Sequence, residues 1–208
     1  MIRILLIDDH AVVREGYRRL LERRGDLSVA GEADSGAEGY RLFRELEPDL
    51  AIVDLALPDM GGIELIGRII RREPRARLLA FSMHRDPLFA THALRAGALG
   101  YVTKSCPPEE LVQAVYKVAR RERVLSPDIA PEVALALVDP PDDPARLLSP
   151  REFEVLRLLL EGRSAEEIGA ALSLSPKTVQ NCHYQIKAKL GVRSDLELAR
   201  LALRHKLL

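Results

Sequence analysis

Short aliphatic runs alternate with longer amphipathic segments along residues 3–120, and this alternation restricts the possible folds more than any other feature of the chain. Five such runs occur, at Ile4–Ile7, Leu27–Ala30, Leu50–Val53, Leu78–Phe81 and Tyr101–Val102. Between them, apolar residues recur at the spacing of a helix that buries one face. Strands that are apolar throughout are typical of parallel sheets covered by helices on both faces. The sequence therefore predicts a (βα)5 domain at residues 1–120.

The pattern changes after residue 120, where prolines and acidic residues gather. We expect residues 121–146 to form a linker that the prolines make semi-stiff, with a short helix at Asp128–Val138. Residues 147–208 then carry only helical signals. They predict a small all-α domain of four short helices, at roughly 150–161, 165–172, 176–190 and 195–205.

Helix-capping signals support these boundaries. Four stretches have the Ser-x-x-Glu form of a capping box, and they begin at Ser35, Ser149, Ser164 and Ser194. Pro150 occupies a first helical position, where its missing N–H costs nothing. Gly162 and Gly191 follow apolar periodic segments, where a glycine commonly ends a helix.

The two parts of the chain carry opposite charge. Residues 1–144 hold 20 Lys and Arg against 24 Asp and Glu, whereas residues 145–208 hold 11 against 7. An acidic first part suits a site for cations, and a basic last part suits an anionic polymer, although scattered surface charge would give the same totals.

Nothing in the sequence predicts export or membrane insertion. Cys106 and Cys182 are too few for a disulfide framework and lack metal-ligand spacing. We find no charged-then-apolar leader and no apolar span of about 18 residues. We therefore expect a soluble cytoplasmic protein without a membrane partner.

Polar residues follow four of the five predicted strands. Asp8 and Asp9 end the first strand, Asp54 the third and Ser82 the fourth, while Lys104 follows the fifth. Sites in open parallel sheets form at the carboxyl ends of the strands, so we expect these side chains to share one crevice. Taken singly, a strand-end aspartate more often caps a loop, and a single lysine is more often solvated.

This set of side chains suits phosphoryl transfer. Two carboxylates about 4 Å apart repel by roughly 4 kcal/mol at an effective dielectric of about 20, and a divalent cation removes that cost. Mg²⁺ prefers a few carboxylates, water and a phosphate oxygen. Asp54 would act as the nucleophile, with Mg²⁺ and Lys104 neutralising the oxygens of the transferred group.

The first part of the chain resembles a known family. The stretches LLIDDHAVVREG, DLAIVDLALPDMGGIEL, LLAFSMH and AGALGYVTKS are similar to the receiver domain of two-component response regulators, over residues 1 to about 120. The resemblance implies a flavodoxin-like fold in which Asp54 takes a phosphoryl group from a sensor histidine kinase. It also implies that Mg²⁺ is bound by Asp8 or Asp9, by Asp54 and by the backbone carbonyl of Ala56.

The same resemblance assigns roles to three further residues. Ser82 would bond the phosphoryl group, and Lys104 would form an ion pair with it. Tyr101 would turn inward as Ser82 moves. Without the resemblance, Tyr101 would be interpreted as a partly buried core aromatic residue.

Two short helices around Ser173-Leu174-Ser175 predict a helix-turn-helix. In the second, Val179, Cys182, Ile186 and Leu190 mark a buried face. The opposite face carries Lys177, Gln180, Asn181, Tyr184 and Ala188. Because no acid occurs from Pro176 to Ser194, this helix suits the major groove of DNA. Gln180 and Asn181 can bond base edges, whereas phosphate contacts are expected from Lys177, Thr178 and Lys187.

The last part of the chain also resembles a known family. LSPREFEVLRLLLEGRSAEEIGAALSLSPKTVQNCHYQIKAKLGVRS is similar to the LuxR-type helix-turn-helix of the NarL/FixJ class, over residues 147 to 205. The resemblance implies base reading by Gln180, Asn181 and Tyr184. It also implies that the last helix helps to pair two copies of the domain, through Leu196, Leu198, Ala199 and Ala202.

Two positions depart from the LuxR-type pattern. The family often has histidine or tyrosine where this chain has Cys182, which we expect to pack inward, with a redox role as the alternative. Gly169 replaces the usual alanine, at a cost in helix propensity of up to ~1 kcal/mol. Shorter stretches, among them SPDIAPEVAL and LELARLALRHKLL, are similar to the GacA/UvrY group of global regulators.

The sequence thus predicts a transcription factor that is activated by phosphorylation of Asp54. It would catalyse only its own phosphorylation and dephosphorylation, and it would dimerise when phosphorylated. Its expected partners are a sensor histidine kinase and double-stranded DNA, with RNA polymerase as a possible third. Two alternatives stay open, namely a Mg²⁺-dependent phosphatase with an aspartate nucleophile and a module that signals through proteins rather than DNA.

Overall fold

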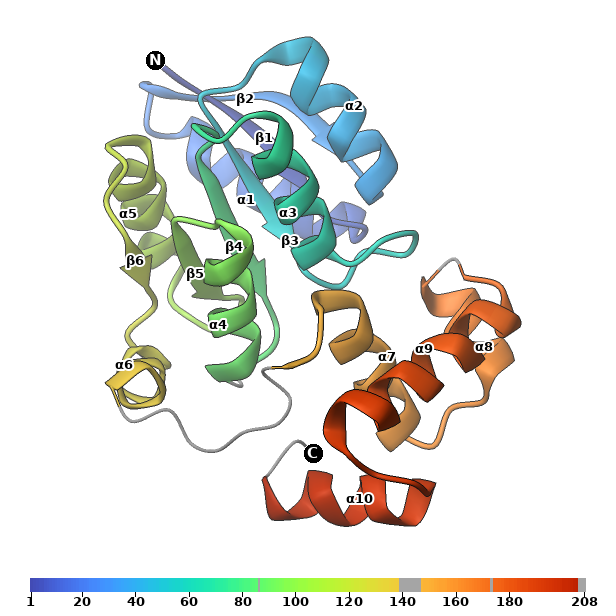
Figure 1. Cartoon of the computed structure of the whole chain (residues 1–208). Coiled ribbons are helices and arrows are strands. Elements are labelled where there is room, and N and C mark those ends of the chain that lie inside the picture. Colours follow the sequence, from blue (N-terminus) through green and yellow to red (C-terminus); the bar gives the residue numbers. More distant parts are fainter. Residues whose placement is uncertain (86, 139–146, 173, 206–208) are drawn as a thin grey trace. The chain divides into compact units, whose positions relative to one another are not determined.

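The computed structural model describes residues 1–85, 87–138, 147–172 and 174–205 (Figure 1). The chain divides into two compact units, Met1–Asp139 and Pro140–Leu208, and each is described by itself. Within the described ranges, no helix combines the length and the apolar character needed to cross a membrane.

The first unit is built on a parallel sheet of six strands in the order β2-β1-β3-β4-β5-β6. The strands are β1 (Ile2–Ile7), β2 (Leu27–Ala33), β3 (Leu50–Asp54), β4 (Leu78–Ser82), β5 (Gly100–Thr103) and β6 (Val124–Leu125). All five predicted strands are confirmed. The sequence did not predict β6, which pairs with β5 at the edge of the sheet.

Helices cover both faces of this sheet (Figure 1). They are α1 (Ala11–Glu22), α2 (Gly36–Leu46), α3 (Gly62–Arg72), α4 (Pro87–Ala96) and α5 (Pro108–Ala119), while α6 (Ala130–Val138) packs against α4. The α1 helix contacts α5, whereas α2 contacts α3 and α3 contacts α4, so the two groups form separate layers. Ile4, Leu6 and Phe81 belong to the same core cluster as Leu111 and Val115 of α5. Both faces being covered explains why the central strands β3 and β4 are apolar up to their last residue.

Residues 121–138, which the sequence analysis assigned to the linker, belong to the first unit. The N–H of Val124 donates to the carbonyl of Leu99, and the N–H of Ser126 donates to the carbonyl of Tyr101. The short predicted helix is present as α6, and it packs against α4. The rest of the predicted linker, residues 139–146, lies outside the described residues.

The part of the second unit that the structure describes contains four helices, as predicted: α7 (Pro150–Leu160), α8 (Ala165–Leu172), α9 (Pro176–Leu190) and α10 (Asp195–Arg204). Ser149 and Glu152 form a complete capping box at the start of α7. Ser164 and Glu167 exchange the same two hydrogen bonds before α8. After α9, Gly191 has a left-handed backbone with φ of +68°, a conformation that glycine adopts without a steric penalty.

Two of the predicted capping boxes are wrong in detail. Ser35 makes no side-chain cap for α2. The carboxylate of Asp59 replaces it, accepting hydrogen bonds from the N–H groups of Gly36 and Ala37 at 2.6 and 2.7 Å. At α10, Ser194 accepts from the N–H of Glu197, but the Glu197 carboxylate accepts from the N–H of Arg193 instead of that of Ser194.

Candidate functional site

The strand register brings the predicted polar residues to one edge of the sheet. Ile7 of β1 is level with Val53 of β3, so Asp8 and Asp54 follow at the same height. Ser82 of β4 is level with Thr103 of β5, and the N–H of Lys104 donates to the Ser82 carbonyl at 2.7 Å. The edge that carries Asp8, Asp9, Asp54, Ser82 and Lys104 is called the rim below.

The ammonium of Lys104 joins two of the rim carboxylates. Its Nζ atom lies 2.5 Å from Asp8 Oδ2 and 2.7 Å from Asp54 Oδ2. All three side chains are nearly inaccessible, with exposed fractions of 6% for Lys104, 8% for Asp8 and 3% for Asp54. The other Asp54 oxygen accepts the N–H of Ala56 at 3.2 Å. These bonds compensate the burial of the Asp54 carboxylate, which would otherwise cost several kcal/mol.

Charge at the rim is only partly balanced. Burial and the nearby Asp8 raise the pKa of Asp54, the neighbouring Lys104 lowers it, and the pKa is left above its ordinary value. Burial lowers the pKa of Lys104, but the carboxylates of Asp54 and Asp8 outweigh burial and leave that pKa raised. One ammonium thus serves two buried acids, so a further cation would be stabilised at this edge.

The acidic side chains at the rim converge closely enough to hold one metal ion. Asp8, Asp9, His10 and Asp54 each place a potential ligand atom within 4.8 Å of the others. His10 was not predicted, although it directly follows Asp8-Asp9 in the sequence. The ring Nδ1 of His10 lies 2.6 Å from Asp9 Oδ1, and the backbone N–H of His10 donates to Asp8 Oδ1 at 2.9 Å. The carboxylate oxygens are hard ligands of the kind that Mg²⁺ prefers, so the residues present fit that ion.

Ser82 and Tyr101 are both connected to the backbone of His84. Ser82 is fully buried, and its Oγ accepts the N–H of His84 at 3.2 Å. Tyr101 is also fully buried, and its hydroxyl donates to the carbonyl of His84 at 2.8 Å. The tyrosine therefore lies inward in this structure. Its predicted movement together with Ser82 remains a prediction.

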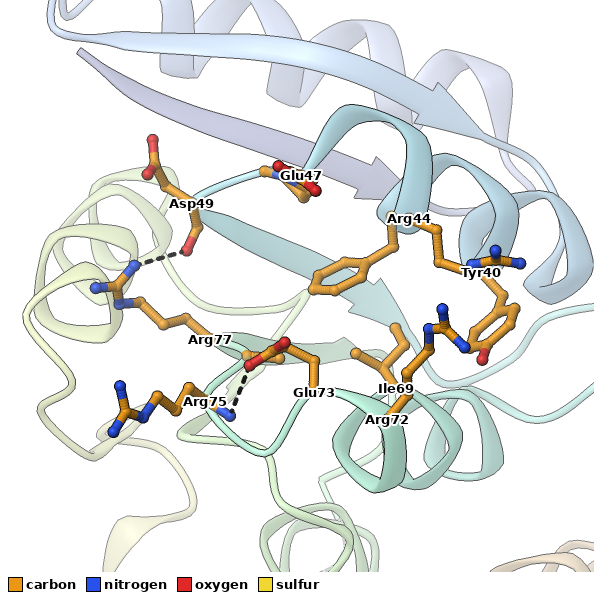
Figure 2. Close-up of a pocket in the computed structure, with 12 residues that line it drawn as sticks. Tyr40, Arg44, Glu47, Asp49, Ile69, Arg72, Glu73, Arg75 and Arg77 are labelled. Atoms are coloured by element: carbon orange, nitrogen blue, oxygen red, sulfur yellow. Dashed lines mark hydrogen bonds between the residues drawn. The ribbon is translucent and has the colours of Figure 1, made fainter.

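The first unit also contains a cavity of about 780 Å³, with Tyr40, Ile69 and Arg72 among its lining residues (Figure 2). It lies near Asp49 and Arg77, which precede β3 and β4, and so it is at the opposite end of these strands from Asp54. Its charged lining combines both signs: Arg44, Glu47, Asp49, Arg72, Glu73, Arg75 and Arg77. Such a lining does not select one class of ligand, and the residues that suit phosphoryl transfer are at the rim.

The α9 helix presents the polar face that the sequence predicted. Val179, Ile186 and Leu190 are buried, and Cys182 is half-buried. The residues predicted to meet DNA bases are exposed: Gln180, Asn181 and Tyr184. Lys177 and Thr178, predicted for phosphate, are exposed too. Burial raises the pKa of the Cys182 thiol, which keeps it protonated and argues against a reactive role.

Two lysines of α9 form ion pairs inside the second unit. Lys187 Nζ lies 2.9 Å from Asp195 Oδ1, and the ring of His183 contacts the same oxygen at 2.9 Å. Lys189 Nζ lies 2.6 Å from Glu152 Oε2, and this bond joins α9 to the start of α7. Lys187 is therefore less available for a phosphate than the sequence suggested. Lys177 forms no ion pair with any described residue.

The predicted dimerisation residues are divided between the two faces of α10. Leu198 and Ala202 are buried, with exposed fractions of 3% and 0%, so they pack within their own unit, and their role in pairing stays a prediction. Leu196 and Leu203 are 63% and 66% exposed, and Ala199 between them is half-buried. The helical period places these three on one outer face.

Comparisons with known families agree with this division of the chain. Residues 4–116 match the model of the response regulator receiver domain, and residues 146–202 match that of the bacterial regulatory proteins of the luxR family. The response regulator GacA of Pseudomonas viridiflava is 40% identical over 207 residues, which cover 99% of this chain and 97% of the relative. The response regulator UvrY of Escherichia coli K12 is 35% identical over 209 residues, covering 100% and 96%.

Solved structures show the same fold. RcsB from Salmonella enterica serovar Typhimurium, bound to promoter rprA in the presence of the phosphomimetic BeF3⁻, is 28% identical with a TM-score of 0.69. The match covers 96% of this chain and 97% of RcsB. A LuxR-family two-component response regulator from Aurantimonas sp. SI85-9A1 is 50% identical with a TM-score of 0.65, over 67% of this chain and 99% of that one.

Proposed function

The chain belongs to the two-component response regulators that join a receiver domain to a LuxR-type DNA-binding domain, and from this we propose that phosphorylation of Asp54 by a sensor histidine kinase controls its binding to promoter DNA. The observation that carries the proposal is the contact of Lys104 Nζ with both Asp8 and Asp54 at the carboxyl edge of the sheet. The domains proposed to carry these activities are residues 1–120 and 147–208.

The rim residues would act as follows. An Asp54 oxygen attacks phosphorus, and the bond from phosphorus to the histidine nitrogen of the kinase breaks, which leaves the electron pair on that nitrogen. The Lys104 ammonium is close enough to pair with the new phosphoryl oxygens, and the Ser82 hydroxyl can turn to donate to one of them. We propose that the catalysis of this domain is limited to gain and loss of its own phosphoryl group.

Mg²⁺ would be held by Asp8, Asp9 and Asp54, with the carbonyl of Ala56 as the fourth proposed ligand. When bound, the ion would neutralise these acids and draw in a phosphoryl oxygen. The Lys104 ammonium now occupies one oxygen of Asp8 and one of Asp54.

Calorimetric titration of the full chain with MgCl2 should show uptake of one ion. Replacing Asp9 with asparagine should weaken that uptake by more than about tenfold, because a carboxylate ligand is lost. Asp34→Asn is the matched control, since Asp34 is an exposed acid that follows β2 at the same edge. Equal weakening in both variants would mean that bulk charge, and not this site, attracts the ion.

We propose that the kinase docks beside α1. Val12 is 87% exposed, and a shallow depression of about 510 Å³ is lined by Val13, Gly16, Leu20 and Pro108 beside it. The helix begins directly after Asp8-Asp9-His10 in the chain, so a partner lying on this apolar surface can bring its histidine to the rim.

We propose that the exposed face of α9 reads base edges in the major groove. Replacing Gln180 with alanine should weaken binding to the preferred duplex about tenfold more than binding to an unrelated duplex, because base contacts carry specificity and phosphate contacts do not. Titrations with both duplexes at fixed salt measure the difference.

Gln113→Ala is the control for the Gln180 variant, because Gln113 is also an exposed glutamine in a helix but belongs to α5 of the first unit, away from the DNA-reading face. If Gln180→Ala weakened both duplexes equally, Gln180 would not read bases. If neither duplex were bound in a salt-dependent way, the protein would signal through proteins instead of DNA.

We further propose that phosphorylation promotes pairing of two copies through the outer face of α10, where Leu196 and Leu203 are exposed. Ala199 lies between them and would allow a close approach. The proposed location is the cytoplasm, where a kinase, promoter DNA and RNA polymerase can all be reached.

A further inference from the structure

The Asp128 carboxylate, just before α6, connects three segments of the receiver fold. Its Oδ2 atom accepts a hydrogen bond from the Thr103 hydroxyl at 2.6 Å. The same oxygen lies 3.3 Å from Arg85 Nε and accepts a longer bond from the Ser105 hydroxyl at 3.4 Å. Its side chain is only 19% exposed. One carboxylate thus holds the end of β5, the loop after β4 and the start of α6 together.

A neighbouring residue strengthens the connection to β5. Ser126 is 1% exposed. Its N–H donates to the carbonyl of Tyr101, and its Oγ accepts the N–H of Thr103 at 3.2 Å. The segment Ser126–Asp128 is therefore bonded to the strand on both sides of Val102. These residues belong to the stretch SPDIAPEVAL, for which phosphoryl transfer needs no role.

One main partner of Asp128 adjoins a residue of the rim, and the other adjoins a residue that is bonded to the rim. Thr103 directly precedes Lys104, whose Nζ contacts Asp54. Arg85 directly follows His84, whose N–H donates to Ser82 Oγ and whose carbonyl accepts the Tyr101 hydroxyl. Movement of Lys104 or Ser82 toward a phosphoryl group would therefore displace the partners of Asp128.

We propose that Asp128 is a positioning residue that couples the phosphorylated rim to α6, and through α6 to the DNA-binding unit that follows it in the chain. The inference rests on the proposed function. Burial raises the pKa of Asp128, but hydrogen bonds from Thr103, Ser126 and Arg85 outweigh burial and hold this pKa below its ordinary value. The group is ionised at neutral pH, and bonds to an ionised acceptor are stronger than neutral ones.

The test compares DNA binding by the full chain with and without acetyl phosphate. The probe is the tightest-binding duplex that the wild-type protein selects from a random-sequence pool. In the wild type, phosphorylation should tighten binding about tenfold, the usual size of such couplings. In Asp128→Asn, phosphorylation should raise the DNA affinity by less than about threefold. Labelling of Asp54 and the DNA affinity of the unphosphorylated protein should stay unchanged.

Thr103→Val is a second variant, because it removes the hydroxyl that bonds Asp128 and keeps the side-chain shape. It should reduce the increase in DNA affinity on phosphorylation in the same way. The double variant should lose no more of this increase than either single variant. A second measurement is the change in hydrogen exchange of the α6 amides on phosphorylation, which a variant that only lost stability would still show. Phosphorylation should change this exchange in the wild type and leave it unchanged in both variants.

Asp26→Asn is the matched control. Asp26 also accepts a hydroxyl hydrogen bond, from Tyr116 at 2.8 Å, but it lies at the opposite end of the strands, before β2. If phosphorylation raised the DNA affinity of Asp128→Asn as much as that of the wild type, the inference would be overturned and the proposed function would stay intact. Absence of any gain in the phosphorylated wild type would overturn both.

Discussion

Replacing Asp54 with asparagine should abolish incorporation of a phosphoryl group from acetyl phosphate. The amide has no anionic oxygen to attack phosphorus, so the loss should be complete within detection. The fold should survive, because Lys104 keeps its 2.5 Å contact with Asp8. Intact-mass spectrometry measures the added phosphoryl group, and thermal unfolding confirms the fold.

Asp34→Asn is again the control for this variant, since it removes an exposed acid that follows β2 and spares the rim contacts. It should be labelled like the wild type. Persistent labelling of Asp54→Asn at equal yield would assign the acceptor to another residue. It would also remove the basis for the proposed kinase reaction.

Replacing Gly62 with alanine should destabilise the receiver domain by about 3 kcal/mol and displace the acceptor strand. A Cβ atom on Gly62 would lie inside contact distance of the Asp54 carbonyl oxygen and 2.6 Å from Leu55 Cα. Both are backbone atoms, so relief requires α3 to move away from the end of β3. Such overpacking typically costs about 1–3 kcal/mol, and occasionally more. Urea unfolding measures the loss.

Gly67→Ala, in the same helix, is the matched control. Its added Cβ would meet nothing closer than the Arg71 guanidinium at 3.6 Å. Alanine should therefore stabilise the helix by up to about 1 kcal/mol, the ordinary difference in helix propensity. A loss in Gly62→Ala no larger than about 0.5 kcal/mol would show that the β3–α3 junction adjusts freely.

Much of the fold follows from local pattern. A continuous apolar run requires cover on both faces, and so the runs near Ile4 and Leu50 already predict central strands. The edge strand β6 escaped detection because it has two residues, both half-buried, and stands among prolines and charges. The α2 cap was assigned to Ser35, whereas Asp59 supplies it. A pattern within one helix cannot reveal a competing carboxylate that lies 23 residues away in the chain.

The rim was predictable because parallel strands bring their carboxyl ends to one edge. Spacing along the chain did not show that His10 joins the acids or that Lys187 is taken by Asp195. Gly169 was interpreted as a cost to helix α8. The structure shows that a Cβ there would lie 2.6 Å from the Leu174 carbonyl, so the tight turn requires glycine.

By itself, the sequence determined the βα repeat, the helical second unit and the residue types at each strand end, because these depend on periodicity and on neighbouring residues. Tertiary structure decided which charges are paired and which apolar residues of α10 are free for a partner. It also brought Asp128 to the end of β5, where it bonds Thr103 beside Lys104, since an ion pair or a buried face depends on segments brought together from distant parts of the chain.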